Sequence, residues 1–517
     1  MVPAIGGTRR MRLPAWIWLA TAALVAWGAT TTNSWITVFS IVLLPVLAFL
    51  LWRRSEPPVL LFACAMQWLQ AATIIFYQDF YRLTLDQAYG GPELARATWL
   101  SLIGVIVVAL GMRAALVGAG KLKWEGVERE SKALSPVRLF WLYLIFLAVS
   151  TFVRSIAFSL PGITQPLIAA TSLHWIPVIL LIEAVLTQRR GYGLLALVVM
   201  LEFGIGLLGY FSSFKSVFLI LFVLLLASPR RLPKGRLVAL FGIVVFLLLA
   251  SAAWTAMKPD YREFLNKGTG EQAVYEPVAA RVEKLIELVG GLNAEKLEQG
   301  FEESMLRISY VTFFAHCMVQ VPADVPYENG ALWFGAVQHT FMPRLFFPNK
   351  ATTDDSVRTA KYTGIDVAGR EQGASIGLGY MAESYIDFGP YFMFAPIFLL
   401  GVFYGLIYRL LAFRERYRLL GAACAIAILV FGAYNIETSN VKLIGGNTMS
   451  VLVLGLFYWR FGPAFFKFVS NPPSRATPKT RNAHRRATFL RKRVQRGGGS
   501  AGEGLSEEVA PPCRPDL

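Results

Sequence analysis

The chain has 517 residues, of which 55% are hydrophobic and 16% are charged, and its formal net charge is +17. Soluble domains carry about a quarter charged residues, so the composition excludes an ordinary soluble protein. Apolar runs of roughly 20 residues recur along the chain and predict an all-α polytopic membrane protein. The positive charge lies mainly in short connections between these runs and in the C-terminal tail, which argues against nucleic-acid binding.

Residues 1–257 contain nine predicted membrane spans. Three arginines before the first run also fit a signal peptide, but a second span follows at once, so we favour an uncleaved first span. Pro166 and Pro177 predict a kink in the sixth span. The predicted spans are 13–28, 35–52, 59–77, 95–112, a fifth that ends near 158, 163–186, 192–209, 214–227 and 237–257.

The segment 258–390 is predicted to be a large periplasmic loop, because it holds eighteen Asp and Glu against twelve Lys and Arg. Its first part, 277–299, is expected to form a helix pair broken at Gly290–Gly291. The apolar runs 304–321 and 331–347 fit either two further spans or two helices that dip into or lie on the outer leaflet. We favour the second interpretation; both keep every Arg/Lys cluster on the cytoplasmic side.

Three more spans are predicted within residues 391–466, at 391–411, 420–434 and 448–466. Residues 467–517 are rich in Pro, Gly and basic residues and are predicted to be a disordered cytoplasmic tail. Its charge suits attraction to anionic membrane lipids. Both termini are therefore expected in the cytoplasm, with about 12 transmembrane helices between them.

Residues 344–370 form a cationic island within the acidic loop. Such an island predicts an anionic ligand, although solvated charges balanced by nearby aspartates would look similar. Arginine forks bind phosphate oxygens bidentately, whereas lysine acts as a point charge. Two further cations stand at helix ends: Lys215 opens the eighth span, and Arg307 precedes a polar stripe of Ser309, Thr312, His316 and Gln320. The island contains Arg344, Lys350, Arg358, Lys361 and Arg370.

Glu383 and Asp387 are four residues apart on a predicted helix, so one of their pKa values is expected to be raised. Such a carboxylate suits a general base, although a helix cap or a salt bridge would use the same residues. No metal-ligand spacing and no phosphate-binding glycine loop occurs in the chain, so we expect neither a metal nor a cofactor.

Two stretches of the loop resemble the bacterial oligosaccharide repeat-unit polymerases of the O-antigen and exopolysaccharide type. These stretches are FMPRLFFPNKATTDD and, entering the tenth span, GASIGLGYMAESYIDFG. FSSFKSVFLILFVLLL also resembles a basic motif of that family, with Lys215 where arginine is usual. The resemblance covers about 50 residues and the general pattern of spans.

This resemblance implies a GT-C-like membrane glycosyltransferase at the outer face of the bacterial inner membrane. It would join repeat units carried on undecaprenyl pyrophosphate, with a chain-length regulator and a flippase as candidate partners. Carried over to this sequence, the resemblance assigns the catalytic base to Glu383, with His339 as second choice. It assigns pyrophosphate binding to Lys215, Arg344 and Lys350, with Arg307 and Arg358 as weaker candidates.

Three other functions remain open. An O-antigen ligase, which transfers finished glycan to lipid A core, has a similar span pattern. A polysaccharide or lipid transporter would carry charges in mid-span, whereas here Glu183 and Glu202 are the only acids within predicted spans, and both lie near expected cytoplasmic ends. A non-catalytic assembly protein is the last alternative.

Overall fold

The computed structural model describes residues 15–53, 56–88, 90–120, 124–160, 162–227, 234–269, 274–342, 354–369 and 374–471, together with 344, 346–347 and 349–350. The described residues up to Ser470 form one compact unit. Arg370 lies outside the described residues, as do residues 472–517, which make up most of the predicted disordered tail 467–517. The start of that prediction is wrong, because residues 467–469 belong to the last helix, Gly462–Val469.

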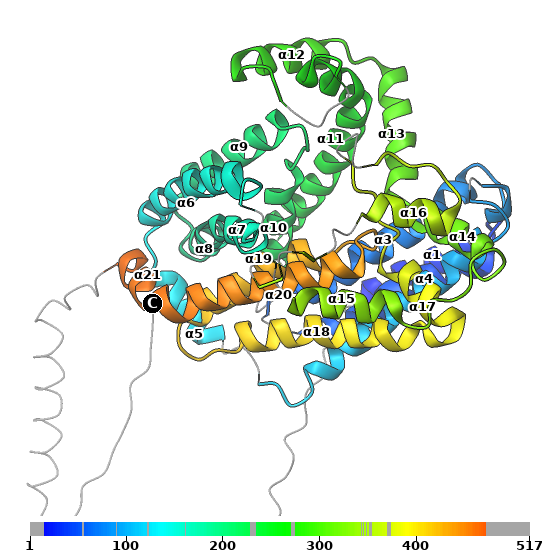
Figure 1. The fold of residues 1–517 in the computed structure, drawn as a ribbon. Helices are drawn as coiled ribbons and strands as arrows, with labels where there is room; N and C mark the ends of the chain where they lie inside the picture. The colour runs from blue at the N-terminus through cyan, green and yellow to red at the C-terminus, as the bar shows by residue number, and fades with distance from the viewer. Residues whose placement is uncertain are drawn as a thin grey trace, which may run out of the picture. The chain divides into compact units, whose positions relative to one another are not determined.

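The described residues form helices and connecting turns, with no strand among them (Figure 1). Within the described ranges, eight helical stretches are long and apolar enough to cross a membrane, and five shorter apolar helices accompany them. The eight are Ser34–Leu51, Val59–Phe80, Leu94–Ala115, Pro136–Ala157, Thr164–Gln188, Lys234–Asn266, Phe394–Ala412 and Asn440–Val469.

In the first half of the chain the predicted apolar runs form helices, and the charged connection between the fourth and fifth runs forms a further helix that was not predicted. The kink expected from Pro166 and Pro177 is a short 3-10 turn, Ser172–His174, between two α-helices. The helices are α1 (Ala15–Gly28), α2 (Ser34–Leu51), α3 (Val59–Phe80), α4 (Leu94–Ala115), α5 (Trp124–Ala133), α6 (Pro136–Ala157), α7 (Thr164–Thr171), α8 (Trp175–Gln188), α9 (Tyr192–Leu208), α10 (Lys215–Leu226) and α11 (Lys234–Asn266).

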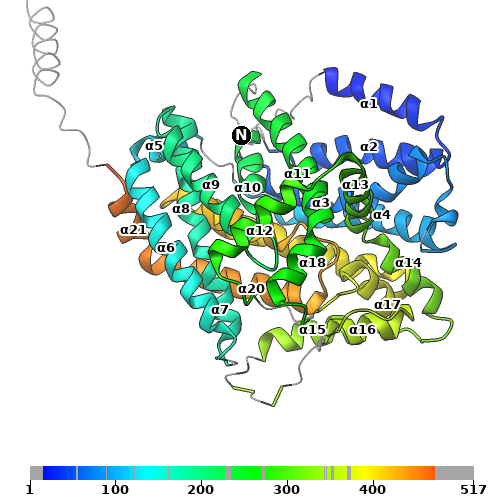
Figure 2. The ribbon, with the colours of Figure 1, turned by 90° about the horizontal axis from the view of Figure 1, so that it is seen from above.

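The predicted loop 258–390 is largely helical and packs on the bundle. The helix pair broken near Gly290–Gly291 is confirmed as α12 and α13, which project with the end of α11 at the top of Figure 1. Figure 2 shows the next four helices together along one edge. The helices are α12 (Val278–Gly290), α13 (Ala294–Ile308), α14 (Val311–Gln320), α15 (Ala331–Phe341), α16 (Asp355–Thr363) and α17 (Tyr380–Phe392).

The last part of the chain begins after a kink at Gly389, whose φ of 69° lies in the left-handed region. This kink moves the start of the tenth predicted span from 391 to Phe394. The helices are α18 (Phe394–Ala412), α19 (Arg418–Gly432), α20 (Asn440–Leu456) and α21 (Gly462–Val469), with a π-helical turn, Phe457–Phe461, before the last.

The tightest helix contact joins α4 to α18 through glycines. A Cβ atom on Gly111 would lie 2.2 Å from the carbonyl oxygen of Phe398, and one on Gly401 would lie 2.2 Å from that of Val108. Small residues of this kind let helix backbones approach closely within a bilayer. The two helices therefore meet backbone to backbone, and α14 packs against α4 beside them.

Candidate functional site

The best-defined polar feature of the molecule is an ion pair between α16 and α17. Arg358 Nη1 donates to Glu383 Oε1 at 2.9 Å, and the backbone N–H of Asn440 donates to Glu383 Oε2 at 2.7 Å. The Glu383 side chain is 0% exposed, while that of Arg358 is 18% exposed. Burial raises the pKa of Glu383 to about 7, and Arg358 opposes the shift.

Two glycines bring α17 against the connection 433–439, which joins α19 to α20. Gly379 has a φ of +89°, and a Cβ there would lie 2.4 Å from the carbonyl oxygen of Ile436. At Gly377 the nearest atom would be the carbonyl oxygen of Glu437, at 3.0 Å. Only glycine permits both this conformation and this approach. The glycines of the predicted motif therefore seat Glu383 against the start of α20.

A second carboxylate, that of Asp355 on α16, also contacts the connection 433–439. Asp355 Oδ2 accepts from Ser439 Oγ at 3.0 Å and from Lys442 Nζ at 2.9 Å. Lys442 also donates to Ser375 Oγ at 2.9 Å. Asp355 is buried, whereas the side chain of Lys442 is 50% exposed. The first turn of α20 is thus bound to both carboxylates of the cluster, Glu383 and Asp355.

The C-terminal end of α15 carries the second predicted base. Lys350 Nζ donates to the carbonyl oxygens of His339 and Met342, the latter at 2.8 Å, and so caps the last turn. This cap ends α15 at Phe341, before the end of the predicted run 331–347. Burial lowers the pKa of His339 to about 4, and three nearby cations act in the same direction: Lys350, Arg344 and Arg358.

A separate set of four cations lies where α10, α11 and α13 meet. Arg307, in the last turn of α13, is within electrostatic range of the other three members. Arg262 stacks over the Tyr210 ring at 4.5 Å and donates to the Tyr210 carbonyl oxygen, just before α10 begins. We call this set the α11 cation group; it consists of Lys215, Lys258, Arg262 and Arg307.

Helix packing explains why these cations gather. α13 lies on α11, with Thr255 Oγ1 2.8 Å from Ser304 Oγ. A Cβ on Gly300 would lie 2.3 Å from the carbonyl oxygen of Ala252. Because α11 continues as a helix beyond the predicted end of its span at 257, Lys258 and Arg262 stay on a rigid element beside Arg307.

One acid stands between the two sets of charges. Glu437, in the connection 433–439, is within electrostatic range of both Arg307 and Lys442. Tyr310, three residues after Arg307, donates from its hydroxyl to the carbonyl oxygen of Gly377. The α11 cation group and the cluster around Glu383 therefore adjoin the same connection.

Two predicted features have structural uses. Asp387 caps α15, accepting from the backbone N–H groups of Leu332 at 3.0 Å and Trp333 at 2.8 Å. This is the helix-cap alternative that the sequence left open, and it separates Asp387 from Glu383. Lys361, a member of the predicted island, pairs with Glu328 at 2.8 Å. Of the predicted ligands, Lys215 is exposed and Arg344 partly exposed.

The prediction of one continuous helix over 304–321 is wrong. The helix breaks between Ile308 and Val311, because α13 packs on α11 whereas α14 packs on α4. Ser309 is buried in the break, so it does not share a helix face with Thr312, His316 and Gln320. The predicted polar stripe is therefore not a single surface.

Sequence reasoning missed the contribution of the connection 433–439 and the start of α20. This stretch separates the predicted spans 420–434 and 448–466 and was given no role, although YNIETSNVK is a polar interruption between two apolar runs and carries both Glu437 and Lys442. Its partners lie more than fifty residues earlier in the chain, and no local pattern pairs them. In the part of the chain that the structure describes, no three His, Cys, Asp or Glu side chains gather as metal ligands do.

These features define the class of the protein: a helical protein with the architecture of a polytopic membrane protein and a charged cluster at the ends of several helices. Residues 75–458 match the family described as Domain of unknown function (DUF8712). The chain belongs to this family. No curated protein and no solved structure matches it.

Proposed function

We propose that the protein is a membrane-embedded glycosyltransferase that polymerises oligosaccharide repeat units carried on undecaprenyl pyrophosphate. The α11 cation group is the observation that carries this proposal. Four like charges from three helices repel one another, with Glu303 and Glu437 as nearby acids, and a multiply charged anion relieves the remaining repulsion. A pyrophosphate on a lipid anchor suits a cation group at helix ends, and Lys215 and Arg307 were assigned to it from the sequence.

The reaction needs a leaving group stabilised and a proton removed. The acceptor hydroxyl oxygen forms a bond to the anomeric carbon of the donor glycan, while the bond from that carbon to the pyrophosphate oxygen breaks. The lipid pyrophosphate leaves with the electron pair, and cations fixed around it stabilise the charge that develops. The hydroxyl proton passes to a base of the protein.

The geometry favours His339 as that base. Its imidazole is neutral at neutral pH and so has a nitrogen lone pair that can accept a proton, although burial and the nearby cations make it a weak base. Both oxygens of Glu383 already accept hydrogen bonds within the protein, which suits the positioning of Arg358 better than proton transfer. Arg344, Lys350 and Arg358, the three cations near His339, would then bind the phosphate oxygens on that side of the donor.

The membrane arrangement belongs to the same proposal. Twelve spans with a GT-C-like fold, both termini in the cytoplasm and segment 258–390 in the periplasm would bring the charged cluster to the outer face of the inner membrane. The excess of acids in that segment and the basic connections elsewhere support this orientation.

Deletion of the gene followed by profiling of undecaprenyl-linked glycans tests the proposal. Accumulated single repeats without long chains are expected. Long chains retained on the carrier would instead indicate a ligase, and an unchanged profile would refute both activities. In complemented cells, Arg344→Ala should abolish polymerisation without reducing the amount of protein in the membrane. Arg416→Ala, at an exposed arginine of the connection between α18 and α19, is the matched control and should polymerise normally.

A further inference from the structure

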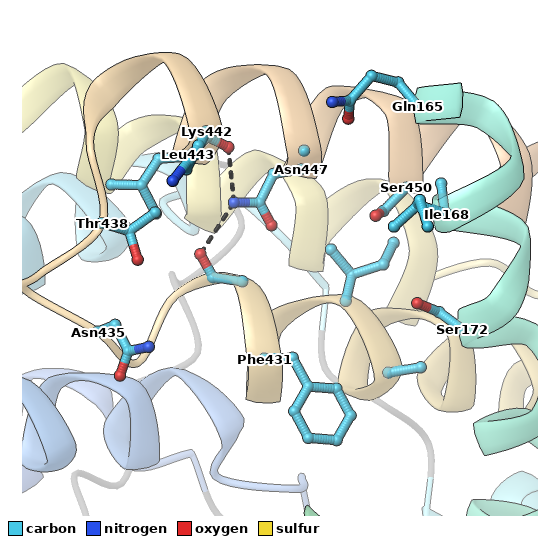
Figure 3. Close-up of a pocket in the computed structure, with 15 residues that line it drawn as sticks. Gln165, Ile168, Ser172, Phe431, Asn435, Thr438, Lys442, Leu443, Asn447 and Ser450 are labelled. Atoms are coloured by element: carbon cyan, nitrogen blue, oxygen red, sulfur yellow. Dashed lines mark hydrogen bonds between the residues drawn. The ribbon is translucent and has the colours of Figure 1, made fainter. Parts of the chain in front are cut away.

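A cavity of about 230 Å³ lies between α7, α19 and α20, beside the cluster around Glu383 (Figure 3). It exceeds many times over the space that one water molecule needs. It is smaller than the roughly 300–1,000 Å³ of pockets for drug-sized ligands. Its size therefore suits one small ring and not a complete oligosaccharide.

Neutral amides and hydroxyls dominate the polar lining of this cavity. Figure 3 shows them on opposite walls, those of α7 facing those of α20 and of the connection 433–439. None of the described residues that line the cavity is Asp or Glu, and its one cation, Lys442, is paired with Asp355. The polar lining residues are Gln165, Ser172, Asn435, Thr438, Asn447 and Ser450.

Asn447 is held in a fixed orientation at the centre of the α20 wall. Its Nδ2 donates to the carbonyl oxygens of Gly432, at 2.9 Å, and Leu443, at 2.8 Å. Both amide hydrogens are thereby used, and Oδ1 is left to accept from a hydroxyl or amide of a ligand. Gly432 makes this arrangement possible, because a Cβ there would lie 1.9 Å from Oδ1.

An aromatic ring completes the lining. Phe431 is partly exposed, and its ring lies 5.3 Å from that of Trp175, centroid to centroid, which holds it in place. A site with an apolar ring and several fixed neutral hydrogen-bonding groups binds a ligand that has both C–H faces and hydroxyls. A phospholipid headgroup is a poorer match, since the phosphate would meet no unpaired cation among the lining residues that the structure describes.

We propose that this cavity binds one neutral sugar ring of the lipid-linked glycan next to the transfer site. The inference rests on the proposed function, because it names the part of the same substrate that the cations do not recognise. The first turn of α20 connects the two regions: Asn440 donates to Glu383, and Lys442 both lines the cavity and pairs with Asp355. A ring in the cavity would thus lie beside the residues proposed to act on the glycan.

Gly446 offers a direct test. It lines the cavity, and a Cβ built on it meets no atom within 4 Å, so Gly446→Leu fills the cavity without a clash at its own position. Gly455→Leu is the matched control: it lies on the same helix, also has open space at its Cβ, and does not line the cavity. Leucine favours a helix more than glycine does, so both variants are expected to fold.

The full chain in lipid nanodiscs would be tested by saturation-transfer NMR. The probe is the oligosaccharide released by mild acid from the lipid-linked glycans of the same cells. Wild type and Gly455→Leu should bind it, and Gly446→Leu should bind at least about tenfold more weakly. Equal binding by Gly446→Leu, absence of binding by the wild type, or displacement of the probe by phospholipid would overturn the inference.

The glycan profiles separate this inference from the proposed function. If deletion leaves the profiles unchanged, the polymerase proposal fails, whereas the NMR measurement still decides on the cavity. If deletion stops polymerisation but Gly446→Leu produces chains of normal length and amount, the polymerase proposal stands and the sugar-binding inference is wrong.

Discussion

Arg358 and Glu383 form an ion pair in which the glutamate side chain is entirely buried and the arginine side chain reaches the surface. Their side chains meet at 2.9 Å, and the backbone of Asn440 holds the second carboxylate oxygen. A buried carboxylate that loses its cation is costly. Replacement of Arg358 would therefore leave the buried carboxylate of Glu383 without a cation and should lower the stability of the protein.

We expect Arg358→Ala to destabilise the protein by about 3 kcal/mol, the low end for a broken buried pair because the arginine is partly exposed. The loss should increase as the pH rises above 7. The folded-state pKa of Glu383 lies above its usual value, so its favourable contribution is complete below pH 4.5 and is lost as the pH rises through 7. Without Arg358 that pKa rises further. Thermal unfolding in detergent between pH 5 and pH 9 measures the effect.

The control for this experiment is Glu383→Gln combined with Arg358→Ala. Because the titrating carboxyl is absent from both Glu383→Gln and the double variant, the difference between their unfolding midpoints should not depend on pH. A loss that is the same at pH 5 and pH 9 in the single variant would contradict the assignment. If Glu383→Gln alone retains most of the polymerisation activity, Glu383 positions Arg358; complete loss would restore Glu383 as the base.

Arg307→Ala should stabilise the ligand-free protein while reducing polymerisation at least about a hundredfold. Stabilisation is expected because Arg307 repels three cations of the α11 cation group and faces one acid, Glu437. Activity is lost because the leaving pyrophosphate loses a cation. Added inorganic pyrophosphate should raise the unfolding midpoint of the wild type but not that of the variant. Arg281→Ala, at a residue that donates to the carbonyl oxygen of Leu208 instead, should respond to pyrophosphate as the wild type does.

Gly379→Ala should destabilise the protein by at least about 2 kcal/mol, since the new methyl group would meet the Ile436 carbonyl in a backbone conformation that alanine rarely adopts. Gly455→Ala is the control, because its Cβ would have open space. Unfolding midpoints of the two variants, measured side by side, decide the matter. Equal midpoints would show that the contact between α17 and the connection 433–439 does not hold the site together.

A reporter fused after Pro326 should read as periplasmic, because the acidic segment 258–390 is expected outside the membrane. A fusion after Arg416, in the basic connection between α18 and α19, should read as cytoplasmic. Alkaline phosphatase and green fluorescent protein fusions at each site report the two sides. Cytoplasmic signal after Pro326 would overturn the proposed orientation and with it the outer-face site.

The helices were predictable because apolar runs of span length leave little alternative to an α-helix in lipid. The residues at which helices begin and end were less predictable. α11 runs on to Asn266 through charged residues that helices tolerate once they leave the apolar region, and α20 starts at Asn440, eight residues before the apolar run. Hydropathy marks where a helix could be buried and does not mark where it stops.

The candidate site was predictable in its residue types and not in its pairing. The island of cations and the Glu383 motif stood out against an apolar chain. That Glu383 would be closed off by Arg358 and Asn440 depends on two glycines meeting a connection more than fifty residues later. Contacts of this length arise from packing, which leaves no local pattern in the sequence.

The glycine contact between α4 and α18 also limits how the protein can move. Backbones that touch at Gly111 and Gly401 cannot slide past each other without collision, so these two helices form a fixed frame. α7 meets α20 across the cavity, and α7 ends at the short 3-10 turn that separates it from α8. We therefore expect any widening of the cavity to move α7 and not the frame of α4 and α18, and a cross-link between α7 and α20 should prevent it.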